Sequence, residues 1–290
     1  MFFPFLNLAL MTVPATPSAS FDAQARVACS APVGTRPRLL GIEINAVAAS
    51  GSDLPYLRIL DRKSGGWMKA YYDASSTRSA WARAACLGAQ IRLINGEIEG
   101  AWRNGQWYSV TFTANPTYIP PRNRHERRWT ILTRPDGALG AEGQNMVVVT
   151  MPHEQVHAFQ KRAGAQLPRW LEEGHAEWVS RRVKARLAPA ASEADVRRYA
   201  DALARSTVPV ELDKWGAVGV TREAILRQAS AEDRKKMAAD PTYIPPGPYK
   251  IVPGDMVSDE SNIDARYEAA QRIFANLETA HGASRVQAWV

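Results

Sequence analysis

Residues 151–157 read Met-Pro-His-Glu-Gln-Val-His, and this run contains an HExxH pattern made by His153, Glu154 and His157. On an α-helix, side chains four positions apart lie on nearly the same face, so both imidazoles can reach one metal ion. Glu154 then points at a water bound to that ion. The stretch therefore predicts a helix that carries two ligands of a Zn²⁺ ion and a carboxylate base beside them.

A third ligand is expected in residues 170–178, which read Trp-Leu-Glu-Glu-Gly-His-Ala-Glu-Trp. A catalytic zinc ion needs three protein ligands and an open fourth position for water. Glu173 and Glu177 share one face of the expected helix, so one can bind the metal while the other hydrogen-bonds a ligand histidine. His175 lies on a different face and is expected to be a surface or packing histidine rather than a metal ligand.

These two stretches resemble the gluzincin metallopeptidases, a peptidase MA-like group in which HExxH is followed by a ligand glutamate. In the membrane alanyl aminopeptidase branch, that glutamate belongs to a Trp-Leu-x-Glu-Gly-x-Ala string, which residues 170–176 match at every fixed position. The resemblance implies that Glu173 is the third ligand of one zinc ion. Glu177 is then left to support a ligand histidine, the alternative being a simple charge on the helix face. A metzincin would need glycine and histidine where Gln160 and Ala163 stand, so a three-histidine site is excluded.

The resemblance extends to residues 267–282, which begin Tyr-Glu-Ala-Ala and end at a glycine. Many gluzincins place a tyrosine near the scissile carbonyl at the head of such a helix. This implies that Tyr267 donates to the developing oxyanion, the alternative being a tyrosine of the helix core. Residues 137–145 lack the Gly-x-Met-Glu-Asn string of the aminopeptidases, and Glu142 is expected to be a solvated carboxylate. Aminopeptidase specificity is therefore not predicted.

The predicted function is that of a zinc metallopeptidase in which Glu154 takes a proton from the attacking water and passes it to the leaving amine. Its partner would be a peptide or protein substrate. A catalytically silent cell-envelope protein that binds zinc or peptides would carry the same ligands and remains an alternative. The net charge of +7 also raises the possibility of an anionic partner. However, the arginine-rich runs 122–128 and 181–186 lack interleaved aromatic residues, so solvated faces are favoured and no nucleic-acid partner is predicted.

Residues 1–20 are apolar, then small and proline-bearing, and no charge occurs before Asp22. This pattern is typical of a secretory signal peptide, although the basic first segment is missing, and the alternative is an apolar tail. Cys29 and Cys86 would then form a disulfide that closes a loop of about 57 residues and contributes on the order of 4 kcal/mol. Two buried free thiols are the alternative. A secreted or periplasmic protein without a transmembrane anchor is predicted.

Residues 21–290 are predicted to form one zincin-like catalytic domain of the α+β class, with a strand-rich part at 21–134 and zinc-site helices with a helical lobe at 135–290. The expected strands are 39–47, 67–72, 91–94, 97–102, 107–113, 129–133 and 146–150, with Asn104-Gly105 as a hairpin turn. The expected helices are 76–87, 153–162, 168–187, 191–205, 221–237 and 267–280.

One six-residue string, Pro-Thr-Tyr-Ile-Pro-Pro, occurs at 116–121 and again at 241–246. Its prolines favour extended or turn backbone. The two copies are too far apart for a repeat architecture, so two unrelated surface connectors are expected.

Overall fold

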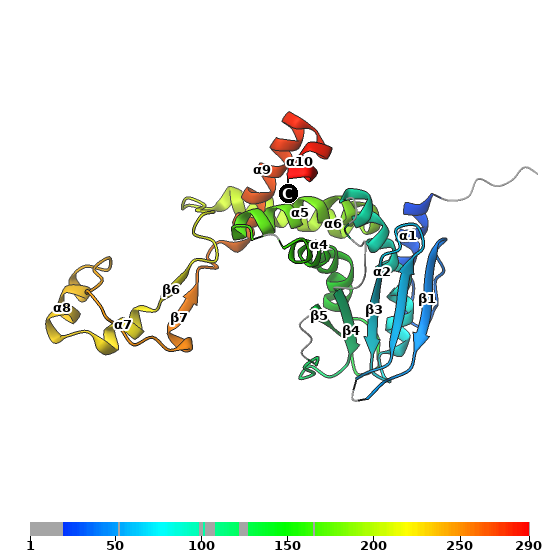
Figure 1. The fold of residues 1–290 in the computed structure, drawn as a ribbon, viewed down its shortest axis with the longest axis horizontal. Coiled ribbons are helices and arrows are strands. Elements are labelled where there is room, and N and C mark those ends of the chain that lie inside the picture. Colours follow the sequence, from blue (N-terminus) through cyan, green and yellow to red (C-terminus); the bar gives the residue numbers. More distant parts are fainter. Residues whose placement is uncertain are drawn as a thin grey trace, which may run out of the picture.

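The computed structural model describes residues 20–51, 53–98, 101, 108–121, 127–164 and 166–289. These residues form a five-stranded sheet, helices packed beside it and an arm that extends from the helices (Figure 1). The predicted combination of helices with a sheet in one chain is thus confirmed. The predicted signal peptide, apart from its last residue, and the predicted Asn104-Gly105 turn lie outside the described residues. Every helix in the described part of the chain is too short or too polar to cross a lipid bilayer.

The sheet contains antiparallel and parallel strands. Its order is β1 (Ile42–Val47), β2 (Tyr56–Asp61), β3 (Trp67–Tyr72), β4 (Tyr108–Thr113) and β5 (Arg127–Leu132). The first three strands form an antiparallel meander, whereas β3, β4 and β5 run parallel to one another. Parallel neighbours need a crossover connection, and helix α2 (Thr77–Glu97) lies in the one between β3 and β4. Strand β4 is buried along its whole length, and β5 lies at the edge of the sheet.

Helix α2 covers one face of the sheet and links it to the N-terminal helix. Glycine allows the close approach, because a Cβ atom added at Gly88 would lie only 2.3 Å from the Ile42 side chain. Helix α1 (Phe21–Cys29) packs on α2. Cys29 and Cys86 join these two helices in the predicted disulfide, with their sulfur atoms 2.08 Å apart.

Helix α5 (Arg169–Leu187) is the centre of the helical layer. It packs against α4 (Met151–Arg162), α6 (Pro189–Arg205) and α9 (Ile263–His281), and a short helix α10 (Ala283–Trp289) follows α9. Gly174 permits the contact between α5 and α9, because a Cβ atom at this position would lie 2.9 Å from the Cβ atom of Ala270. The glycine of the Glu-Glu-Gly sequence is therefore needed for helix packing next to the predicted ligand.

The arm comprises residues 206–262, between α6 and α9, and extends away from the sheet in Figure 1. It contains a two-stranded antiparallel ribbon, two helices and a 3₁₀ turn: β6 (Val218–Val220), α7 (Arg222–Gln228), α8 (Ala231–Ala239), η2 (Pro253–Asp255) and β7 (Met256–Ser258). Its small core of Ile225, Ala229 and Met237 is separate from the main core.

The predicted strand Met146–Thr150 is wrong, because these residues are helical. Helix α3 (Ala141–Asn145), a π-helical turn η1 (Met146–Thr150) and α4 follow one another without a break. The run Val147–Val149 favours a strand by its β-branched side chains. A short buried helical segment can have the same apolar composition, and only the tertiary structure distinguishes the two.

Three other local predictions are also wrong. The predicted strand Ile91–Ile94 lies inside α2, which continues to Glu97 instead of ending at Leu87. The predicted strand 97–102 is wrong at its start, because Glu97 belongs to α2, and the described residues of β4 pair on both sides with the parallel strands β3 and β5. The predicted helix 221–237 is divided into α7 and α8, where Ser230 caps α8 by accepting a hydrogen bond from the Asp233 backbone. Strand β2 was not predicted at all.

The two copies of the repeated string have the same turn geometry. Asn115 precedes the first copy and Asp240 the second, and each side-chain oxygen accepts hydrogen bonds from the backbone N–H and the hydroxyl of the threonine two residues later. These are Asx turns. The isoleucines of both copies are exposed, so the expected surface position of the strings is confirmed.

Candidate metal centre

The helix that carries His153 and His157 is fixed by a buried glutamine of α2. Gln90 donates from Nε2 to the carbonyl oxygen of Val147 at 2.7 Å, within the π-helical turn, and its Oε1 accepts from Gln155 Nε2 at 2.6 Å. A π-helical turn adds one residue to the helix, which rotates the residues after it by about 100°. The turn and its hydrogen bonds therefore set which face of α4 is directed at α5.

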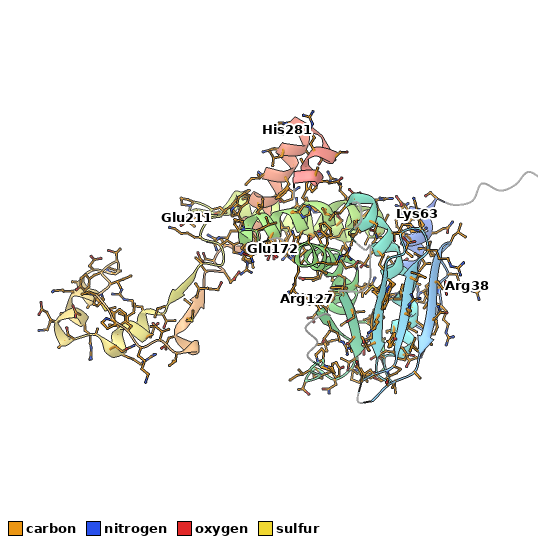
Figure 2. The ribbon with its side chains drawn as sticks, viewed as in Figure 1. Arg38, Lys63, Arg127, Glu172, Glu211 and His281 are labelled. Atoms are coloured by element: carbon orange, nitrogen blue, oxygen red, sulfur yellow. A yellow bond between two sulfur atoms is a disulfide. The ribbon has the colours of Figure 1, made fainter. Side chains whose placement is uncertain are left out.

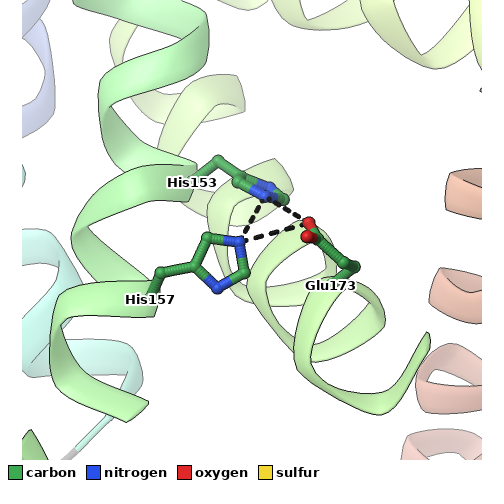
Figure 3. Close-up of side chains that lie close together, drawn as sticks. All are labelled: His153, His157 and Glu173. Atoms are coloured by element: carbon green, nitrogen blue, oxygen red, sulfur yellow. Dashed lines mark hydrogen bonds and ion pairs between the residues drawn. The ribbon is translucent and has the colours of Figure 1, made fainter. Parts of the chain in front are cut away.

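Three side-chain atoms from α4 and α5 converge, as Figure 3 shows. His153 Nε2 and His157 Nε2 are 2.9 Å apart, and Glu173 Oε2 lies 3.1 Å from the first and 3.2 Å from the second. Zinc ligands about 2.0–2.1 Å from the metal in a tetrahedron are separated from one another by roughly 3.3 Å. The three predicted ligands are thus brought together at nearly the spacing that a metal ion requires.

The chemistry of this donor set fits a divalent cation. Two neutral imidazoles that direct their Nε2 lone pairs at each other and at a carboxylate repel one another, and a cation between them removes the repulsion. Burial opposes a charge on His153, but its hydrogen bonds to Glu173 and Glu177 outweigh burial and raise its pKa to about 9. A proton on His153 can therefore take the place of the cation when no metal is bound.

The Nδ1 atom of His153 faces a buried, charged network. Glu177, which is 1% exposed, places Oε2 at 3.3 Å from this nitrogen. Glu177 also accepts hydrogen bonds from Lys184 at 3.0 Å and from Arg181 at 2.9 Å. Burial raises the pKa of Glu177, but Lys184, His153 and Arg181 outweigh burial and hold it well below its usual range. The structure thus places Glu177 beside His153, one of the predicted ligands.

The Nδ1 atom of His157 has a neutral partner instead. Gln160 Oε1 lies 2.7 Å from it, and Gln160 Nε2 is close to the backbone oxygen of Glu172 and to His175. His175 is buried against Trp178 and Phe274 and is not part of the cluster of predicted ligands, so it is a packing histidine rather than a surface one. Burial and then the nearby His157 lower the pKa of His175 to about 4.

Glu154 is mostly buried, and its Oε2 atom has no hydrogen-bond partner among the described residues. Burial raises the pKa of this carboxyl, while the neighbouring His153 and His157 act in the opposite direction. A buried carboxylate oxygen without a partner is costly. A water molecule or another donor beside the three clustered side chains would satisfy it.

Tyr267, which was predicted to be an oxyanion donor, also contacts the cluster of predicted ligands. Its hydroxyl donates to Glu173 Oε2 at 3.0 Å, and its ring stacks on Tyr199 and contacts Trp215 of the arm edge-on. Burial, followed by the charge of Glu173, raises the pKa of Tyr267 far above its usual value. The hydroxyl therefore stays protonated and can donate a hydrogen bond.

Several residues that contact the predicted ligands or Glu177 were not expected from the sequence. Arg169 places Nε at 3.6 Å from Glu173 Oε1 and is paired with Glu260 of the arm, so it links the arm to the third ligand. Its spacing of four residues before Glu173 on one helix could have indicated this. Gln160 lies three residues after His157, so the same helical spacing could have indicated this contact. Lys184 lies seven residues after Glu177, which is outside that spacing.

The arginine-rich run 181–186 is not the solvated face that was expected. Arg181 and Lys184 belong to the buried network around Glu177, while Arg182 is paired with Glu278 and Arg186 with Asp22. In the other run, Arg128 makes a bidentate pair with Asp53, and residues 122–126 lie outside the described part of the chain. Glu142 is exposed, as expected.

Comparison with known proteins gives no relative for this chain. No family model matches it, and neither the curated proteins nor the solved structures contain a significant match.

Proposed function

We propose that this protein is a zinc-dependent metallopeptidase of the gluzincin type, with a zincin-like catalytic domain. The observation that carries the proposal is the convergence of His153 Nε2, His157 Nε2 and Glu173 Oε2 within 3.2 Å of one another. Two features of the surroundings support it: the unpartnered buried oxygen of Glu154 and the Tyr267 hydroxyl 3.0 Å from Glu173.

The ligand set would be His153, His157 and Glu173. A bound zinc ion supplies the Lewis acidity that polarises a peptide carbonyl and makes water acidic. Glu154 takes the proton of the attacking water and gives it to the nitrogen of the leaving amine. The Tyr267 hydroxyl leaves Glu173 and donates to the oxyanion of the substrate. Glu177 holds His153 through Nδ1.

The proposed location is outside the cytoplasm, in the periplasm or the medium. The Cys29–Cys86 disulfide supports this location, because such bonds persist in oxidising compartments. Residues 1–20 would act as the signal peptide that directs export.

The test replaces Glu154 by Gln and measures cleavage of a peptide library and zinc content together. We expect the wild type to cleave and Glu154→Gln to keep its zinc while losing about 10²–10⁴-fold in kcat/KM, because the base is lost and the ligands remain. Glu142→Gln, at an exposed carboxylate on α3, is the matched control and should leave both values unchanged. A wild type that binds zinc but cleaves no peptide would instead identify a silent zinc-binding or peptide-binding protein.

A further inference from the structure

A buried chain of hydrogen bonds joins the two helices that carry the ligands, and Gln160 is its centre. Gln160 is 1% exposed. Its Nε2 donates to the backbone oxygen of Glu172 at 2.8 Å and lies 3.1 Å from His175 Nδ1, while its Oε1 lies 2.7 Å from His157 Nδ1. Thus a residue of α4 contacts one metal ligand directly and also holds the residue that precedes another, Glu173.

The orientation of the Gln160 amide is determined by the backbone of α5. The oxygen of Glu172 can only accept a hydrogen bond, so the group 2.8 Å from it must be the NH₂ of Gln160. The reversed amide would place two oxygen atoms against each other in a buried position, where the repulsion is not screened. The Oε1 atom must therefore face His157.

The proton of His157 follows from this orientation. Because Gln160 Oε1 can only accept, His157 must carry a hydrogen on Nδ1 to make the contact at 2.7 Å. In the neutral ring, Nε2 then bears the lone pair, and Nε2 is the atom that faces His153 and Glu173. We propose that Gln160 is a positioning residue that holds the proton of His157 on Nδ1 and so keeps Nε2 ready for the metal.

The same chain assigns a role to His175. The second hydrogen of the Gln160 NH₂ points to His175 Nδ1, so this nitrogen is the acceptor and the ring proton resides on Nε2. A protonated Nδ1 on His175 would compete with Gln160 and disturb the contact to His157. The buried position of His175 between Trp178 and Phe274 keeps its ring in place.

This inference rests on the proposed metal centre but not on peptide cleavage, and it can be tested on the metal-free full chain. Long-range ¹H–¹⁵N spectra of protein labelled in its histidines report which nitrogen of each neutral ring carries the proton. We expect His157 to be protonated on Nδ1 and His175 on Nε2 in the wild type. A proton on His157 Nε2 would overturn the proposal without any variant.

Two substitutions separate positioning from simple packing. Gln160→Leu removes the acceptor, so we expect both tautomers of His157 and a 10- to 100-fold weaker zinc affinity. Gln160→Glu keeps an acceptor oxygen for Nδ1–H but loses the donor to Glu172. It should therefore lose stability while retaining the tautomer and a zinc affinity no weaker than that of the wild type, because a carboxylate makes the ring at least as good a donor as an amide does.

A packing role alone predicts that zinc affinity falls in proportion to stability in both variants, and this result would contradict the proposal. An unchanged tautomer and an unchanged zinc affinity in Gln160→Leu would also contradict it. If the wild type binds no zinc, the metal centre itself is wrong and the role of Gln160 falls with it.

Discussion

The two ligand histidines of α4 have unlike surroundings. On one side, His153 Nδ1 faces the carboxylate of Glu177, which belongs to a buried network with Lys184 and Arg181. On the other side, His157 Nδ1 faces the neutral amide of Gln160 at 2.7 Å. Both contacts direct Nε2 toward Glu173, but only the first brings charge into the interior.

The charged partner Glu177 and the neutral partner Gln160 have different effects on the histidines that they contact. Burial opposes a charge on His153, but the carboxylates of Glu173 at Nε2 and Glu177 at Nδ1 outweigh burial and raise its pKa, so a proton on Nε2 can occupy the position proposed for the metal. The amide of Gln160 sets the position of a proton without adding charge. In the proposed metal site, His153 would therefore exchange its proton for the metal, whereas His157 would be a fixed support.

The largest difference that we expect between the His153 side and the His157 side of the site is in the free energy of unfolding. Lys184→Met should destabilise the metal-free protein by about 3–5 kcal/mol, because it leaves the buried carboxylates of Glu177 and Asp195 without their shared cation. Gln160→Met, a matched change on the neutral side, should cost about 1–3 kcal/mol. Urea unfolding in the presence of a chelator measures both. Equal losses of unfolding free energy in the two variants would show that the charged network contributes no more to stability than the neutral contact does.

A smaller effect is expected on metal affinity. Glu177→Gln should weaken zinc binding by about 10- to 100-fold, because an amide makes His153 a poorer donor than a carboxylate does. Glu268→Gln is the control, since Glu268 is buried and pairs with Arg181 but does not touch a histidine. Competition with a chromophoric chelator gives both affinities. If the control loses as much affinity as Glu177→Gln, the effect comes from the network as a whole and not from the contact with His153.

The smallest change in a single step, at most about tenfold in affinity per pH unit, concerns pH. The pKa of His153 is raised from 6.5 to about 9, so its charge stabilises the metal-free fold fully below about pH 6.5, and this contribution is lost as the pH rises through about 9. Zinc needs the neutral ring, so its binding at pH 7 should release about one proton from His153, and the affinity should rise up to about tenfold per pH unit until about pH 9. Calorimetry in buffers of different ionisation enthalpy measures the number of protons released when zinc binds. Binding without proton release from His153 would contradict the exchange.

The sequence predicted the zinc-site helices well because their signals are local. A proline in the first turn and Gly164 after the end define α4, and helix α5 begins directly after Pro168 and ends directly before Ala188-Pro189. The spacing of four residues in HExxH then placed both histidines on one face. The resemblance of residues 170–176 to a known string, rather than spacing alone, selected Glu173 over Glu177.

The failed predictions depend on contacts between distant residues. Val147–Val149 favour a strand locally, but they lie in a π-helical turn whose carbonyl is bound by Gln90 of another helix. The pairing of β4 with parallel neighbours on both sides likewise cannot be read from its own alternation. Lys184 resembled a surface residue because Asp195, which lies on α6, pairs with it only after α5 and α6 have packed.

The most direct test of the metal centre is the zinc content of the full chain purified without chelators. We expect about one equivalent per chain, and we expect it to be lost in His157→Ala and Glu173→Gln but kept in Glu142→Gln. Less than about half an equivalent in the wild type, or zinc retained after both ligand substitutions, would contradict a site formed by His153, His157 and Glu173.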